Sequence, residues 1–394
     1  MKFVTISELF DVTSSKRVFQ SEWTDFGVPF YRAREIVKLS REGHVKNDLF
    51  ISETMYSKYS SKYGAPKEGD LLVTGVGTLG ICYQVKSEDR FYFKDGNIVW
   101  FKKKSSVSSD YVEYCFKSPY VKRQIASKAD GATVGTYTIT NAKETKIPLP
   151  PLEQQQQITA ILDAADELRQ KDKALIAKYD ELTQSLFLDM FGDPVTNPKK
   201  WKSVKLESVC GKITDGTHKT PIYKDSGVIF LSAKNIKKYE LNCDSPKYIS
   251  KEEHALLSKR CNVEKDDILI TKSGSLGMAA MVGFDFEFSI FESLALLKYI
   301  RESIDGKFLL YYLNTPSTQY KYAGITKGVG VKHLHLSDLR RLDIILPSRA
   351  IQKHFTERIQ SIESQKTLAQ ESLDKSEALF NSLLQKAFKG ELTN

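Results

Sequence analysis

The 394-residue sequence contains 58 lysines and arginines and 49 aspartates and glutamates, so its formal net charge is +9. Its length and its 41% hydrophobic content are typical of a globular protein with two domains. No apolar run approaches the roughly 20 residues of a membrane span, and no secretory signal is recognisable. The five cysteines form neither a CxxC pair nor an even framework, which indicates reduced thiols in a cytoplasm.

The chain contains two copies of one pattern. KEGDLLVTGVGTLG at 67–80 returns as EKDDILITKSGSLG at 264–277, and IPLP at 147–150 returns as IILP at 344–347, both at an offset of 197. Nearer the N-terminus the offset is 200, so the second copy is about three residues shorter in one loop. Solenoid repeats are roughly 20–50 residues long, so this pattern predicts a duplicated domain.

Short β-branched and aromatic runs predict the same strands in both copies. They lie at 70–74, 81–85 and 98–101 in the first copy and at 229–232, 267–271 and 294–299 in the second. Helices are predicted at 111–116 and 307–313, and each ends before a proline because proline disfavours a helical residue before it. Polar loops at 128–138 and 324–333 follow, and each copy closes with a strand that runs into proline.

After each copy, apolar residues recur in a 4/3 register that predicts a long helix. The register comprises Ile158, Leu162, Ala165, Ile176, Tyr179, Leu186 and Met190 in the first helix and Phe355, Ile359, Ile362, Ala369, Leu373, Phe380, Leu383 and Ala387 in the second. Matching stripes predict that the helices pair with each other as an antiparallel coiled coil, related by a pseudo-two-fold axis. Gly192-Asp193-Pro194 ends the first helix, and the second is expected to stop near Lys389-Gly390.

The predicted fold class is therefore α+β, with two tandem mixed α/β domains separated by the two long helices. The predicted boundaries are 1–150 and 193–347 for the domains, here called the first and second lobes, and 151–192 and 348–394 for the helices.

The excess positive charge belongs to the lobes. Residues 153–191 have 4 basic and 8 acidic side chains, and residues 349–394 have 7 and 6, which leaves 47 basic and 35 acidic residues in the rest of the chain. A net charge of +12 on the lobes suits a polyanion, because phosphate neutralisation releases counterions. A solvated basic surface is the alternative.

Three motifs suggest chemistry, but their context does not support it. GVGTLG at 75–80 matches GxGxxG, yet a strand follows it and not a helix, so we predict a tight turn. His333 and His335 alternate as metal ligands can, but no further ligand is near in sequence. Glu144 and Lys146, with Asp130, are the residues that a metal-dependent nuclease would use. We predict no catalytic and no metal site.

The remaining candidates are loop positions rich in Thr, Lys, His and Gly, above all TDGTHKTP at 214–221. Small residues let the backbone approach a surface, while Lys and His reach phosphates or base edges. The candidate DNA-binding residues are Arg32, Arg34, Thr78, Thr133, Thr136 and Tyr137 in the first lobe and Thr217, His218, Lys219, Thr220, Lys272, Ser273, Ser275, Lys327, Lys332 and His333 in the second. For each of them a solvated turn is the alternative.

Over essentially its whole length the sequence resembles the specificity subunit of type I restriction-modification systems. The resemblance is carried by TDGTH-x-TP at 214–221, by the GDLLVT and DDILIT segments with their GxxG turns, and by IPLPPLEQQ at 147–155. It implies two target-recognition domains, each recognising one half of a split, asymmetric DNA sequence, with the helix pair fixing the gap. The first lobe has Thr13-Ser14-Ser15-Lys16 where the second has TDGTH, so DNA contacts do not transfer between lobes.

The resemblance also implies partners. Two methyltransferase subunits, which bind S-adenosylmethionine and flip an adenine out of the duplex for N6-methylation, are expected to dock on the helices and lobes. The candidate docking residues are Ile158, Leu162, Leu186, Phe355, Ile359 and Phe380. Two restriction subunits with ATP and Mg²⁺ join such complexes in the family, whereas this chain is expected to be non-catalytic, cytoplasmic and without a cofactor. A stand-alone metal-dependent nuclease and a non-specific scaffold stay as alternatives.

Overall fold

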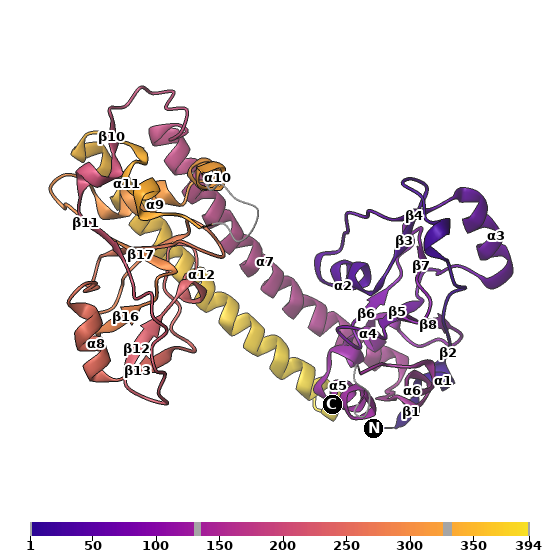
Figure 1. The fold of residues 1–394 in the computed structure, drawn as a ribbon. Coiled ribbons are helices and arrows are strands. Elements are labelled where there is room, and N and C mark those ends of the chain that lie inside the picture. The colour runs from indigo at the N-terminus through magenta and orange to yellow at the C-terminus, as the bar shows by residue number, and fades with distance from the viewer. Residues whose placement is uncertain (1, 130–134, 326–332, 393–394) are drawn as a thin grey trace. The chain divides into compact units, whose positions relative to one another are not determined.

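The computed structural model describes residues 2–129, 135–325 and 333–392, and the chain divides into two compact units. The first unit consists of residues 1–173 and 371–394, and the second of residues 174–370. Each unit therefore contains one lobe together with one part of each long helix (Figure 1). Among the described residues, no helix is long and apolar enough to cross a membrane.

The described residues of the first lobe form three sheets. The antiparallel four-stranded sheet has the order β2 (Phe10–Thr13), β8 (Ile98–Lys103), β5 (Leu71–Thr74), β6 (Cys82–Gln84). The three-stranded sheet has the order β4 (Phe50–Ile51), β3 (Val28–Tyr31), β7 (Tyr92–Phe93), with β3 antiparallel to β4 and parallel to β7. The antiparallel pair is β1 (Phe3–Thr5) with β9 (Lys146–Pro148).

The second lobe repeats this topology sheet by sheet. Its four-stranded sheet has the order β11 (Cys210–Asp215), β17 (Leu294–Tyr299), β14 (Ile268–Thr271), β15 (Ala279–Met281). Its three-stranded sheet has the order β13 (Lys247–Ile249), β12 (Val228–Leu231), β16 (Phe288–Ile290), and its pair is β10 (Ser203–Lys205) with β18 (Asp343–Ile345). Parallel and antiparallel pairings also correspond, which confirms the duplicated domain.

The helices of the two lobes correspond to each other less closely than the strands do. The first lobe has α1 (Ile6–Leu9), α2 (Ala33–Glu42), α3 (Glu53–Tyr63), α4 (Ser109–Lys117), α5 (Pro119–Ala129) and α6 (Ile139–Glu144). The second has α8 (Lys251–Ser258), α9 (Gly306–Leu313), α10 (Pro316–Ile325) and α11 (Leu336–Arg340). The largest difference follows β3 and β12, where the ten-residue α2 is replaced by a single 3-10 turn at Ala233–Asn235.

The predicted strands and the helices α4 and α9 are present within a few residues of their expected bounds. The two prolines that were expected to end α4 and α9 also begin the next helices, α5 and α10. Proline suits the first helical position because that residue needs no hydrogen-bond donor there. The sequence did not predict α2, α3 or α8.

The GxGxxG segment is a tight turn between the antiparallel strands β5 and β6, as predicted. Gly77 and Gly80 have φ of +71° and +73°, which side-chain-bearing residues rarely adopt. A Cβ on Gly80 would also lie 2.4 Å from Cδ1 of Ile125. The glycines therefore serve the turn and its packing against α5, and no helix follows to hold a dinucleotide.

The two long helices, α7 (Leu152–Phe191) and α12 (Arg349–Lys389), are antiparallel within each unit. In the second unit the Phe187 ring packs on Phe355 at 5.6 Å, and Asp180 pairs with Lys366 at 2.6 Å. In the first unit Asp172 accepts a hydrogen bond from Ser372 at 3.1 Å. In these contacts an earlier residue of α7 always meets a later residue of α12. The two helices therefore run in opposite directions, as the sequence predicted.

The helices end where the sequence predicted. Gly192 and Gly390 follow α7 and α12 with φ of +75° and +79°, the left-handed conformation of a helix C-terminus. The predicted stripe residues on both helices are all buried or half-buried. Some belong to the lobe cores: Ile158, Leu162, Ala165, Phe380 and Ala387 in the first unit and Leu186, Phe355 and Ile359 in the second.

Candidate DNA interface

In each lobe the loops that hold the candidate residues leave from one edge of the four-stranded sheet. In the first lobe the ends of β2 and β5 and the start of β8 lie there, because Thr13 pairs with Trp100 and Thr74 with Ile98. In the second lobe Asp215 pairs with Ala295 in the same way. We call these loops the loop edge: residues 14–17, 75–80, 94–97 and 136–137 in the first lobe and 216–220, 272–277, 291–293 and 333–334 in the second.

The last segment of each loop edge is held by the same backbone bond. The amide of Tyr137 donates to the carbonyl of Gly75, and the amide of Leu334 donates to the carbonyl of Lys272, both at 2.9 Å. These bonds place Thr136 and His333, both exposed, beside the β5–β6 and β14–β15 turns. Distant parts of the predicted candidate set therefore lie together.

Asp215, the last residue of β11, is the centre of a charged cluster in the second lobe. It is 3% exposed, and its carboxylate accepts a hydrogen bond from Lys272 Nζ at 2.6 Å and pairs with Arg260. His218 Nε2 lies 3.2 Å from the same carboxylate, and His218 Nδ1 lies 2.8 Å from Glu292. The structure thus brings the predicted His218 and Lys272 together around Asp215, which lies within the predicted TDGTHKTP segment, and adds Arg260 and Glu292, which the sequence reasoning missed.

The TDGTH backbone is fixed against the neighbouring loop. The amide of Thr217 donates to the carbonyl of Ile290 at 3.1 Å, and the amide of Glu292 donates to the carbonyl of Thr217 at 2.9 Å. A Cβ on Gly216 would lie 2.0 Å from the Ile290 carbonyl oxygen, so only glycine fits this approach. The segment holds its side chains on a rigid strand end.

The other second-lobe candidates differ in exposure. His218, Lys219, Thr220, Ser275 and His333 are exposed. Thr217, Lys272 and Ser273 are half-buried, and the Thr217 hydroxyl oxygen accepts a hydrogen bond from the Lys219 amide at 3.2 Å. Lys327 and Lys332, like Thr133 of the first lobe, lie outside the described residues.

In the first lobe a second charged cluster lies at the N-terminus of α2, directly after β3. Glu35 is 3% exposed and accepts hydrogen bonds from the Arg32 guanidinium at 3.1 and 3.2 Å, and it also pairs with Arg34. Arg34 also contacts both carboxylate oxygens of Asp48, at 2.9 and 3.0 Å. The amide of Lys94 donates to the carbonyl of Tyr31, so this cluster adjoins the loop edge.

Thr78 and Thr136 are exposed on the loop edge of the first lobe, but Tyr137 is not. Tyr137 is 2% exposed, and its hydroxyl group hydrogen-bonds the hydroxyl of Thr145 at 2.7 Å. Its ring packs edge-on against Phe116 in the core. This corrects the expectation that Tyr137 contacts DNA.

The described residues of the nuclease and metal alternatives do not cluster as metal ligands would. Glu144 is exposed and pairs with Lys128 at 2.8 Å, and Asp130 lies outside the described residues. Across residues 2–129, 135–325 and 333–392, no group of three His, Cys, Asp or Glu side chains could hold a metal ion.

Comparison with known proteins agrees with this arrangement of two lobes. The type I restriction modification DNA specificity domain matches residues 1–178 and 198–377, which together are most of the chain. The chain belongs to this family.

Two relatives of this chain are described as specificity subunits of type I restriction enzymes. A putative type I restriction enzyme specificity subunit of Haemophilus influenzae is 31% identical over 42% of this chain and 40% of its own length. The EcoBI specificity subunit of Escherichia coli is 26% identical over 68% of this chain and 63% of its own length. The match thus spans less than two thirds of either relative.

Two solved structures share the fold of these specificity domains. A chain from a type I R-M system matches with a TM-score of 0.60 at 19% identity, covering 99% of this chain and 98% of that one. The type I restriction-modification S subunit of M. genitalium matches with a TM-score of 0.53 at 16% identity, covering 98% and 96%.

The structure also corrects the choice of docking residues on the long helices. Ile158, Leu162, Leu186, Phe355, Ile359 and Phe380 are each at most 5% exposed, because they pack within the specificity-domain cores. Besides Leu152 and Leu188, the exposed large apolar residues of α7 are Ile161, Leu168, Leu175 and Leu182, which are 36–48% exposed. They recur every seven residues, a signal that the sequence contained and the reasoning overlooked.

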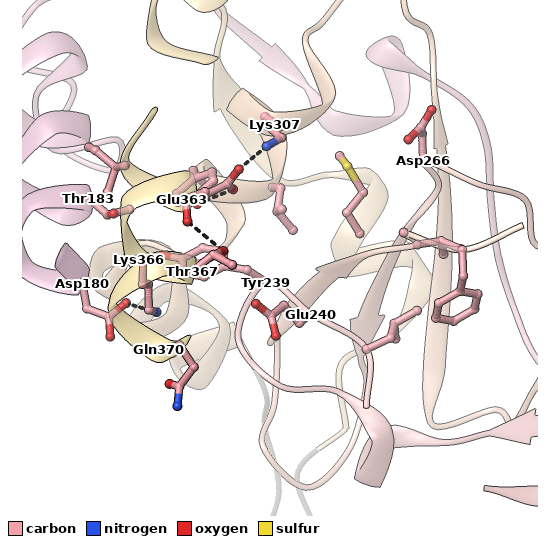
Figure 2. A pocket seen from close by; sticks show the side chains of 18 residues that line it. Asp180, Thr183, Tyr239, Glu240, Asp266, Lys307, Glu363, Lys366, Thr367 and Gln370 are labelled. Carbon is pink, nitrogen blue, oxygen red and sulfur yellow. Dashed lines mark hydrogen bonds and ion pairs between the residues drawn. The ribbon is translucent and has the colours of Figure 1, made fainter. Parts of the chain in front are cut away.

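A cavity of about 780 Å³ lies in the second unit among α7, α12, α9 and the segment around Tyr239 (Figure 2). Lys366 in its wall pairs with Asp180 at 2.6 Å, and Lys307 pairs with Glu363. Because both lysines already have acidic partners, this cavity is a poor site for a DNA phosphate.

The Asp215 cluster predicts how stability depends on pH. Burial acts to raise the pKa of Asp215, but the hydrogen bond from Lys272 and the charges of Lys272, His218 and Arg260 outweigh it and lower the pKa. The ionised carboxylate therefore stabilises the fold above about pH 4, and this contribution is lost as the pH falls through the lowered folded-state pKa. We expect the unfolding free energy of Asp215→Asn, measured by urea denaturation, to fall less steeply with acidification than that of the wild type.

The control is Asp285→Asn, which removes a carboxylate whose side chain is 76% exposed. This variant should keep the acid dependence of the wild-type protein. An Asp215→Asn variant with the acid dependence of the wild type would contradict the conclusion that the ionised Asp215 carboxylate stabilises the fold.

Proposed function

We propose that this chain is the non-catalytic DNA-specificity subunit of a type I restriction-modification complex, in which each lobe recognises one half of a split, asymmetric DNA sequence. One observation carries the proposal: two lobes share their strand order but present different side chains from the same loop edge. Family membership supports it independently.

The loop edges differ at positions that the backbone makes equivalent. Gly75 of the first lobe corresponds to Lys272 of the second, and Thr136 corresponds to His333, since the same backbone bond joins each pair of segments. The first lobe has no room for a side chain at this point, because a Cβ on Gly75 would lie 2.9 Å from the carbonyl oxygen of Tyr137. Different hydrogen-bonding groups at equivalent places favour two dissimilar half-sites.

Each lobe has the charge that DNA binding needs. Residues 1–150 contain 23 basic and 17 acidic side chains, and residues 192–348 contain 24 and 18, so each lobe has a net charge of +6. Lysine and arginine contacts to phosphates give affinity that falls steeply with salt, while contacts to base edges give specificity. Both lobes are therefore suited to DNA, and acting on chromosomal DNA would place the protein in the cytoplasm.

We further propose that two methyltransferase subunits, carrying S-adenosylmethionine, dock on the helix pair. The support is the stripe of Ile161, Leu168, Leu175 and Leu182, which are exposed and recur at one heptad position, so that they offer apolar contacts to a partner. Restriction subunits, which would bind ATP and Mg²⁺, would join the complex that this chain forms with the methyltransferase subunits. They would not bind to the lobes of this chain alone.

The first test is the methylated-adenine motif of the host genome, compared with and without this gene. We expect a bipartite motif with two different halves, which disappears when the gene is deleted, because the lobes select the site and the partner modifies it. An unchanged set of methylated motifs would contradict the proposal. Cleavage of DNA by the purified chain with Mg²⁺ alone would favour a nuclease instead.

The second test concerns docking. Leu175→Lys should weaken association with the purified methyltransferase subunit about tenfold or more, because a buried leucine contributes roughly 1.5–3 kcal/mol. Isothermal titration calorimetry measures the dissociation constant. The matched control is Ala177→Lys, an exposed residue that lies away from the stripe on the same helix turn. Equal dissociation constants for the two variants would show that the stripe is not the docking surface.

A further inference from the structure

Each lobe contains a buried carboxylate that pairs with basic side chains at or beside its loop edge. Glu35 and Asp215 are each 3% exposed, and each pairs with at least two basic side chains. They do not occupy equivalent positions: at the offset of 200, Glu35 corresponds to Asn235 and Asp215 to Ser15. The two lobes therefore have the same kind of cluster without having inherited it from the duplication.

A buried carboxylate at this place is unfavourable for DNA affinity. Its burial removes a charge from water, which costs free energy unless that charge is paired. Its negative charge also cancels part of the attraction between the neighbouring cations and phosphates. A surface selected only for tight binding would therefore lack Glu35 and Asp215.

What the carboxylates supply is fixed geometry. A long basic side chain loses up to about 1.5–2 kcal/mol of conformational entropy when it is ordered. The Lys272 ammonium is already held 2.6 Å from Asp215, with its side chain 12% exposed. The Arg32 guanidinium is likewise held by Glu35 through two of its nitrogens. Side chains ordered before binding can discriminate between base edges without a further ordering cost.

We propose that Glu35 and Asp215 are positioning residues that set sequence discrimination, Glu35 for the half-site of the first lobe and Asp215 for that of the second. This inference rests on the proposed function. It follows that their loss frees the cations to contact phosphates of any sequence. Discrimination falls while affinity for unrelated DNA stays the same or rises.

The effect is confined to one half-site for each residue. The contacts of Glu35 come from Arg32 and Arg34 of its own lobe, and Asp48 extends the same network. The contacts of Asp215 come from Arg260, Lys272 and His218 of the second lobe. A residue that only stabilises the fold would not affect the recognition of one half-site and leave the other unchanged.

The test uses the full chain in complex with its methyltransferase subunit. Dissociation constants are measured for the wild type, Glu35→Gln and Asp215→Asn on the target DNA, on targets scrambled in one half, and on unrelated DNA. The amides keep a carbonyl oxygen that can accept the same hydrogen bonds but remove the charge. We expect the ratio of unrelated to target dissociation constants to fall about tenfold, with tolerance of scrambling in one half for each variant.

Glu53→Gln and Asp285→Asn are the matched controls, since these exposed carboxylates pair with Arg90 and Lys265. Both controls should keep the wild-type ratio. A uniform loss of affinity for all three kinds of DNA, an unchanged ratio, or relaxation of both halves together would overturn the inference. A wild-type complex without any sequence preference would instead overturn the proposed function.

Lys272→Gln keeps the inference testable if Asp215→Asn does not fold, as judged by its thermal unfolding. Removing the held cation should relax the same half-site that is assigned to the second lobe, and leave the other half intact. Retention of full discrimination by Lys272→Gln would overturn the role of this cluster.

Discussion

The packing of each lobe on both long helices is the constraint on which the rest of the structure depends. Leu162 of α7 and Phe380 of α12 belong to the core of the first lobe, while Phe187 and Phe355 belong to that of the second. Neither helix can therefore shift its register without exposing apolar surface in a lobe. Asp172, which is 7% exposed, adds a polar contact within the helix pair, and such groups disfavour other registers because a shift would remove their partners.

This constraint leaves the loop edge as the part of each lobe that is free to differ. The central strands of the four-stranded sheets, β5 and β8 in the first lobe and β14 and β17 in the second, are mostly buried and fixed by their packing, and the two lobes share them. Several side chains of the loop edge are exposed, among them Thr78, Thr136, Lys219 and His333, so substitutions at those positions cost little stability. The Glu35 and Asp215 clusters illustrate the result, because each lobe orders its basic side chains by the same physical means from a different position.

The fold could be predicted because its elements repeat and its apolar residues are periodic. The residues of the site neither repeat nor follow a period, so they could be predicted only in part. Strands, turns and a long helix appear twice in the sequence, whereas α2 has no counterpart among the described residues of the second lobe. Arg260 and Lys272 are far from Asp215 in sequence and are brought to it by the tertiary fold, which a single sequence does not show. Periodicity identified the apolar stripes that pack inside the protein, such as that of Leu162, but the exposed residues that recur every seven positions, such as Leu168, were overlooked.

The central claim, that each lobe independently specifies one half of the target, is tested most directly by a chain with two first lobes. Residues 203–347 are replaced by residues 3–150, since β10 corresponds to β1 and Pro347 to Pro150. The methylated-adenine motif is then sequenced in cells that express this chain with the methyltransferase. We predict a motif whose two halves carry the same sequence, that of the first lobe. Retention of the wild-type second half would contradict the account.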